Sequence, residues 1–136
     1  MKGWWIFAII ALILWGLWGF FSKLATNYMR PKSVLVYEVL GTLIIGIISL
    51  SLLRFRPLVH PKGITFAILT GMSGGLGVLF FLSAVSRGKA SVVVTTTALY
   101  PLITIILASF LLKEPITLKQ GIGIILALIA MILLST

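Results

Sequence analysis

Apolar residues occur in five long runs along the chain, and short segments with basic residues and prolines separate them. A helix needs about 20 mostly apolar residues to cross a hydrocarbon core ~30 Å thick. Each run is close to that length, so the pattern predicts five membrane-spanning helices in one domain over residues 1–136. The expected spans are residues 4–22, 34–53, 64–85, 90–112 and 118–135.

The connectors carry residues that begin or end helices. Proline lacks a backbone donor and is tolerated between spans; the connectors contain Pro31, Pro57, Pro61 and Pro115. Thr117 and Gln120 have the spacing of a capping box for the last helix. In lipid, backbone groups must be paired within the chain, and the alternating period of a membrane strand is absent. The sequence therefore predicts an all-α membrane protein with short loops.

The composition argues against catalysis. Of the 136 residues, 60% are hydrophobic and 10% are charged, whereas soluble domains have roughly half and a quarter. Cysteine is absent, the one histidine (His60) lies in a connector, and Glu38 and Glu114 are the two acids. This inventory offers no catalytic set, no metal site and no cofactor site. We expect a protein that is not an enzyme.

The net charge of +9 is distributed over the span ends. Cations at helix ends meet lipid headgroups, whereas nucleic-acid binding needs a contiguous basic face. One side of the membrane would receive Lys2, Arg54, Arg56, Lys62, Lys113 and Lys119, and the other Lys23, Arg30, Lys32, Arg87 and Lys89. Six against five is almost no bias under the positive-inside rule. Either another determinant fixes the orientation, or the chain inserts both ways and an inverted pair is the working unit.

Several stretches together resemble a known repeat. They are Leu14-Trp15-Gly16 and Lys23 in the opening, Ala98-Leu99-Tyr100-Pro101 in the fourth span, and Lys113-Glu114-Pro115 followed by Gln120-Gly121 at the start of the last span. This order is similar to the EamA-type repeat of the drug/metabolite transporter superfamily, and most closely to its single-repeat, five-span bacterial and archaeal branch. Typical members of the family have ten spans, built from two such repeats in opposite orientation.

The resemblance implies a transporter of small molecules in the cell (inner or cytoplasmic) membrane. A lone repeat would find its inverted partner by forming an antiparallel homodimer and would work by alternating access. Its partners would be the lipid bilayer, a small-molecule substrate and a second copy, with no nucleic acid. The alternatives are a non-transporting membrane subunit and one half of a heterodimeric transporter or flippase.

Glu38 is the most informative candidate for a transport role. It lies inside the second span, where an acid is costly and usually faces a cavity or a partner. Thr42 lies one turn further on the same side of the helix. One interpretation is that Glu38 binds a proton or a cationic group of the substrate. The other is an acid at the membrane surface that pairs with Lys32 or Arg30.

Pro101 lies in the middle of the fourth span and removes one backbone donor. Thr97, Tyr100 and Thr104 would give this helix a polar face around the bend. We expect the bend to line the substrate path. The alternative is a bent packing helix whose threonines bond to their own backbone.

Aromatic and small residues complete the candidates. Trp15 lies deep in the first span and could form an aromatic wall of a pocket, whereas Trp18 fits anchoring at the membrane interface better. Small residues let helices approach closely in membranes. We expect helix packing or a dimer contact at Gly71 and Gly75 in the third span, or at Gly123 and Ala127 in the last.

Overall fold

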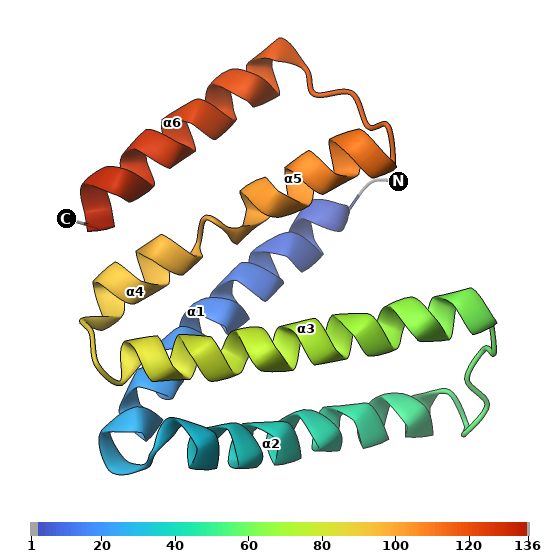
Figure 1. Ribbon diagram of the computed structural model, residues 1–136. Coiled ribbons are helices and arrows are strands. Elements are labelled where there is room, and N and C mark those ends of the chain that lie inside the picture. Colours follow the sequence, from blue (N-terminus) through green and yellow to red (C-terminus); the bar gives the residue numbers. More distant parts are fainter. Residues whose placement is uncertain (1–2, 136) are drawn as a thin grey trace. The chain divides into compact units, whose positions relative to one another are not determined.

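The computed structural model describes residues 3–135, and this part of the chain is all helical apart from its connectors (Figure 1). The helices are α1 (Trp4–Tyr28), α2 (Pro31–Leu52), α3 (Pro61–Val85), α4 (Ala90–Thr97), α5 (Tyr100–Leu111) and α6 (Leu118–Ser135). The chain divides into two compact units, residues 1–86 with α1–α3 and residues 87–136 with α4–α6. The all-α prediction is confirmed.

The helices have the length and the surface of membrane spans. α1, α2, α3 and the stretch Ala90–Leu111 are each long and apolar enough to cross a membrane, and α6 is a shorter apolar helix. Large side chains point outward along them, for example Phe7 at 75% and Phe66 at 68% exposure. Water does not tolerate apolar surface on this scale, whereas lipid does. The protein is therefore a multi-pass membrane protein.

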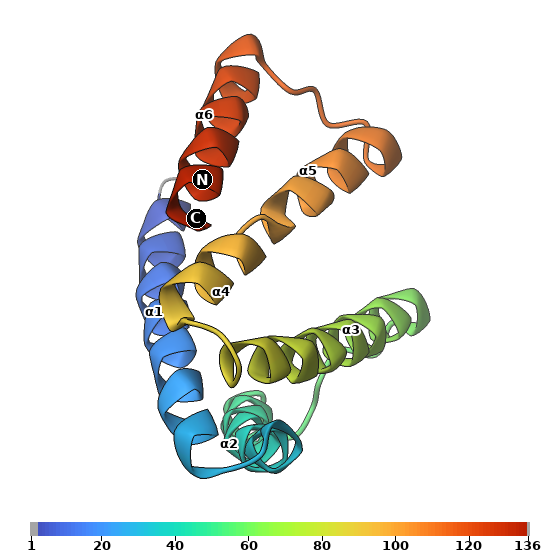
Figure 2. The same cartoon turned by 60° about the vertical axis from the view of Figure 1, so that its left-hand side comes forward.

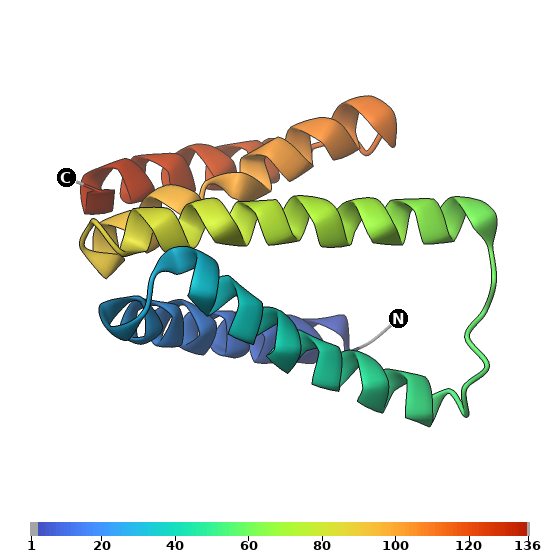
Figure 3. The same ribbon diagram turned by 60° about the horizontal axis from the view of Figure 1, so that its bottom comes forward.

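The buried core of the first unit lies at one end of its three helices. There α1, α2 and α3 pack together around Gly19, Ser22, Val34, Phe81, Leu82 and Val85. Leu82 and Val85 are fully buried. Figure 3 shows α2 beginning close to the end of α3 and diverging from it along its length. Figure 1 shows α1 crossing α3 near the same end, and the tight turn at residues 29–30 joins α1 to α2. The small residues on α1 allow α3 to approach closely.

A lysine fastens this end of the unit. The Nζ of Lys23 on α1 donates a hydrogen bond to the carbonyl of Val85, the last residue of α3, at 2.9 Å. The last carbonyls of a helix lack partners within the helix and carry partial negative charge. A cation here both satisfies an acceptor and favours the helix terminus.

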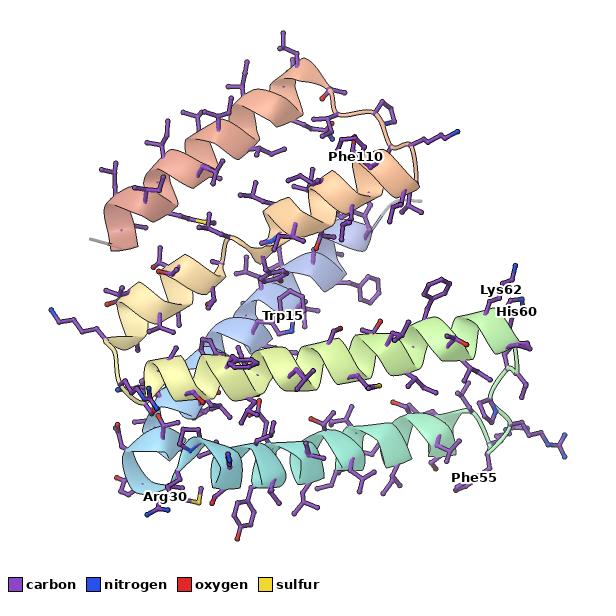
Figure 4. The ribbon with its side chains drawn as sticks, viewed as in Figure 1. Trp15, Arg30, Phe55, His60, Lys62 and Phe110 are labelled. Carbon is purple, nitrogen blue, oxygen red and sulfur yellow. The ribbon has the colours of Figure 1, made fainter. Side chains whose placement is uncertain are left out.

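Two helices begin earlier than the sequence pattern indicated. Pro31 and Pro61 are the first residues of α2 and α3 rather than parts of connectors, because a first-turn amide has no helical partner and proline loses nothing there. His60 precedes α3, and its Nδ1 accepts a hydrogen bond from the Gly63 amide at 3.1 Å. Figure 4 shows His60 and Lys62 at this start of α3, and Arg30 at the opposite end of the unit, between α1 and α2.

In the second unit, the stretch expected to form one bent span is divided into α4 and α5. Figure 2 shows the chain leaving its helical course between the two. Residue 101 is a proline and cannot donate to the Thr97 carbonyl, and the Leu102 amide bonds to Leu99 at 3.0 Å instead of continuing the regular ladder. α6 returns alongside α4.

The capping box of the last helix is confirmed. The Thr117 amide donates to Gln120 Oε1 at 2.9 Å, and the Gln120 amide donates to Thr117 Oγ1 at 3.3 Å. These reciprocal bonds satisfy amides that have no partner in the first turn. The start of α6 at Leu118 is therefore encoded locally.

Replacing Leu82 tests the location of the core. Leu82→Ala should lower the free energy of unfolding by ~2 kcal/mol or more, because it leaves a cavity in the only fully enclosed region described for residues 3–86. Leu76→Ala, on the same helix but with a side chain 57% exposed, should cost much less. Unfolding in mixed detergent micelles measures both variants, and equal losses would contradict this core.

Candidate functional site

Glu38 lies at the junction of the three helices of the first unit. It is the eighth residue of α2, about 10 Å along the helix from its start at 1.5 Å per residue. Its side chain is half-buried, and Oε1 accepts a hydrogen bond from the indole Nε1 of Trp18 on α1. Oε2 is buried and has no hydrogen-bond partner in the described part of the chain. Neither Arg30 nor Lys32 provides that missing partner.

Trp18 connects this carboxyl to α3. Its ring stacks on Phe81 with a centroid separation of 4.7 Å and an interplanar angle of 29°. Phe81 is itself buried in the core of the unit. The indole is thus held by its ring on one helix and by its N–H on another. The contact sets the carboxyl of Glu38 at the border between the packed core and the open part of the unit.

A groove of about 510 Å³ opens between α2 and α3, beginning at Glu38. Its walls are Leu35, Glu38, Val39, Thr42, Leu43 and Gly46 from α2, and Gly71, Gly74, Gly75 and Val78 from α3. A Cβ built on Gly71, Gly74 or Gly75 would meet no atom within 4 Å, so the missing side chains leave real space. Gly71 and Gly75, expected at a helix contact, here line a groove.

The groove offers few polar groups. The hydroxyl of Thr42 donates to the carbonyl of Glu38 at 3.0 Å, within α2. The other lining residues are aliphatic or glycine. Of the groups that line it, the carboxyl of Glu38 is the one that can carry charge. The groove can therefore bind an apolar body and one polar group beside Glu38.

Trp15, another candidate in the first span, is not among the residues that line this groove. Trp15 is 63% exposed and lies midway along α1 (Figure 4). Trp18, which the sequence pattern assigned to anchoring, instead contacts both Glu38 and Phe81. A signal for this was present: Ser22 is one turn beyond Trp18, and a small residue at that spacing marks the face of α1 that packs. Phe81 had no such signal.

The candidates around the bend belong to the second unit. The Thr97 hydroxyl donates back to the carbonyls of Val93 and Val94 at 2.9 and 3.1 Å. Tyr100 and Thr104 are exposed on α5.

The bend also borders a small cavity. Pro101 and Ala127 both line this apolar space of about 90 Å³ inside the second unit. Gly123 is exposed on α6. A Cβ there would meet no atom within 4 Å, so the small face of α6 is open at this point.

The long apolar helices define a multi-pass membrane protein, and in its first unit a half-buried carboxyl lies beside a groove. The model of the EamA-like transporter family matches residues 2–136, and the chain belongs to this family. An uncharacterised protein of Methanocaldococcus jannaschii is 33% identical over 132 residues, which cover 96% of this chain and 94% of the relative. No solved structure matches the chain. Family members are membrane transporters of small molecules rather than enzymes.

The contact between Trp18 and Glu38 can be measured by a double-mutant cycle. We expect Trp18→Phe, Glu38→Leu and the double variant to give a coupling free energy of about 1.5–3 kcal/mol, the range for hydrogen bonds to charged groups. The measurement is unfolding in mixed micelles. Trp15→Phe with Glu38→Leu is the matched control and should be additive, because Trp15 is mostly exposed. Additivity in the Trp18 cycle would contradict the contact.

Proposed function

We propose that the protein transports a small solute by alternating access as an antiparallel homodimer in the cell membrane, and that Glu38 exchanges a proton during the cycle. The observation that carries the proposal is the carboxyl of Glu38, with one oxygen bonded to Trp18 and the other buried without a partner beside the groove. Intramembrane acids of this kind mark substrate and proton pathways.

A proton is the simplest counterpart for this carboxyl. A buried carboxylate oxygen without a partner is unfavourable, so Glu38 needs a counterpart, which can be a proton or a cation. The helices packed on Glu38 offer little charge. On α1, Lys23 is bonded to the Val85 carbonyl, and on α3 the one titratable residue, Lys62, lies at the far end. Glu38 is therefore free to alternate between a proton and a cationic solute.

A second copy supplies what one repeat lacks. Typical members of the family combine two oppositely oriented repeats, and this sequence contains one. The archaeal relative is about as long, because the match covers 94% of it. The charges on the two sides are nearly equal, which permits both orientations. Because Gly71 and Gly75 line the groove and Ala127 lines the apolar space of the second unit, we propose that the dimer contact lies at Gly123 on α6.

The remaining candidates fit the same mechanism. Alternating access needs a part that moves, and the break before Pro101 supplies one in the second unit. We propose that Thr97, Tyr100 and Thr104 line the path at this break. In the first unit, Trp15 and Thr42 would border it with Glu38.

Neutralising Glu38 should uncouple transport from protons. Proteoliposomes with an internal pH dye and an imposed pH gradient would receive a sugar, an amino acid, an organic acid or an amine in turn. We expect one solute to accelerate the collapse of the gradient with the wild-type chain but not with Glu38→Gln, while Glu38→Asp keeps part of the rate. Protein-free vesicles correct for passive permeation.

The outcomes separate the alternatives. Equal solute-dependent proton flux in Glu38→Gln would reject the role of Glu38. No accelerated flux with any solute, from correctly folded protein, would instead support a subunit that does not transport.

Mapping both termini tests the antiparallel pair. With accessibility tags at residues 1 and 136 in the same cells, each terminus should be detected on both sides of the membrane, because the loop charges are nearly balanced. A fixed orientation would contradict the antiparallel homodimer. It would favour one half of a heterodimeric transporter, which a co-purifying partner of opposite orientation would then reveal.

A further inference from the structure

The lining of the groove restricts the solutes that it can bind. Apart from Glu38 and Thr42, its walls are aliphatic residues and glycines, with no lysine, arginine, histidine or amide side chain. The amides of these helical segments are engaged in the helices, and the Thr42 hydroxyl donates to the backbone carbonyl of Glu38 within α2. A carboxylate or phosphate group on a solute would therefore find no donor. Sugars would leave most of their hydroxyls unpaired against this surface.

The carboxyl of Glu38 selects for an N–H donor with positive charge. Its Oε1 already accepts an N–H bond, from the indole of Trp18. Indole is neutral, so it cannot compensate the carboxylate once the proton has left. An ammonium group supplies both the N–H and the charge, and charge-assisted bonds of this type are about twice as strong as neutral ones. The ammonium group would replace the indole N–H of Trp18 at Oε1, because Oε2 is buried and not accessible to a solute.

The groove also sets the size of the apolar body. The eight helical steps from Glu38 to Gly46 span about 12 Å along α2 at 1.5 Å per residue. Across from them, Gly71, Gly74 and Gly75 form a floor without side chains. A volume of about 510 Å³ accepts one aromatic ring with a short alkyl chain.

We propose that the solute is a lipophilic primary or secondary amine, bound as its ammonium ion. Its N–H takes the position of the Trp18 indole on Glu38, and its apolar body lies on the glycine floor between α2 and α3. This inference rests on the proposed transport function, whose solute class it names.

Equilibrium binding to the full chain in nanodiscs tests the class without requiring transport. Three probes share one body: 4-phenylbutylamine, which is charged near pH 7 as lysine is, the neutral 4-phenylbutanol and the anionic 4-phenylbutyrate. We expect the amine to bind at least about tenfold more tightly than either analogue, as a charge-assisted bond predicts. Equal affinities, or preference for the anion, would overturn the proposal.

Variants locate the binding. Glu38→Gln should remove the tenfold advantage of the amine, and Glu114→Gln, the matched change at the other acid, should leave it intact because Glu114 is exposed outside the groove. Gly75→Val has room for its side chain in the free protein but occupies the floor, so it should weaken amine binding by about tenfold. Unchanged amine affinity in both Glu38→Gln and Gly75→Val would place the amine elsewhere and overturn the proposal.

Tryptophan emission reports the displacement of the indole. The chain has four tryptophans, and changing Trp4, Trp5 and Trp15 to phenylalanine leaves only Trp18 to emit. We expect 4-phenylbutylamine, but not 4-phenylbutanol, to shift its emission. Amine binding with no change in Trp18 emission would contradict the exchange at Glu38.

The binding and flux experiments distinguish failure of the amine proposal from failure of the transport proposal. Amine binding that depends on Glu38, without flux of any solute, would support the site and reject transport. Flux of another solute that depends on Glu38, with no amine binding, would support transport and overturn the amine class.

Discussion

The hydrogen bond between Trp18 and Glu38 is the contact on which the site depends. Without it, a carboxyl about a third of the way along α2 would lie among aliphatic side chains with no donor for either oxygen. The bond satisfies one oxygen, and the stacking on Phe81 holds the indole in place. The same contact draws α1, α2 and α3 together at one end, next to the buried Leu82 and Val85. Structure and candidate chemistry therefore share the same few side chains.

The fold was readable from the sequence because lipid imposes a simple rule. Runs of about 20 apolar residues must form helices to pair their backbone groups, and the structure has helices in all five expected runs. Local signals were also reliable where both partners are close in the chain. The Thr117–Gln120 capping box and the interruption before Pro101 are examples.

The site was only partly readable. Glu38 stands out because an acid inside an apolar run is costly. Its partner Trp18 lies 20 residues before it and Phe81 lies 43 residues after it, so their meeting depends on how the helices pack. Glycine spacing on α3 indicated a special face but could not distinguish a helix contact from the floor of a groove, since both require the absence of side chains.

The break between α4 and α5 has a mechanical consequence. In a continuous helix, tilting one half against the other stretches the backbone bonds at the bend. Here the Thr97 carbonyl faces a proline that has no N–H, and the Leu102 amide is already bonded to Leu99. Flexing at residues 98–99 therefore breaks fewer regular ladder bonds than it would in a continuous helix. Tilting α5 against α4 therefore costs less here than bending a continuous helix would, and Pro101 determines where along the span this bending occurs.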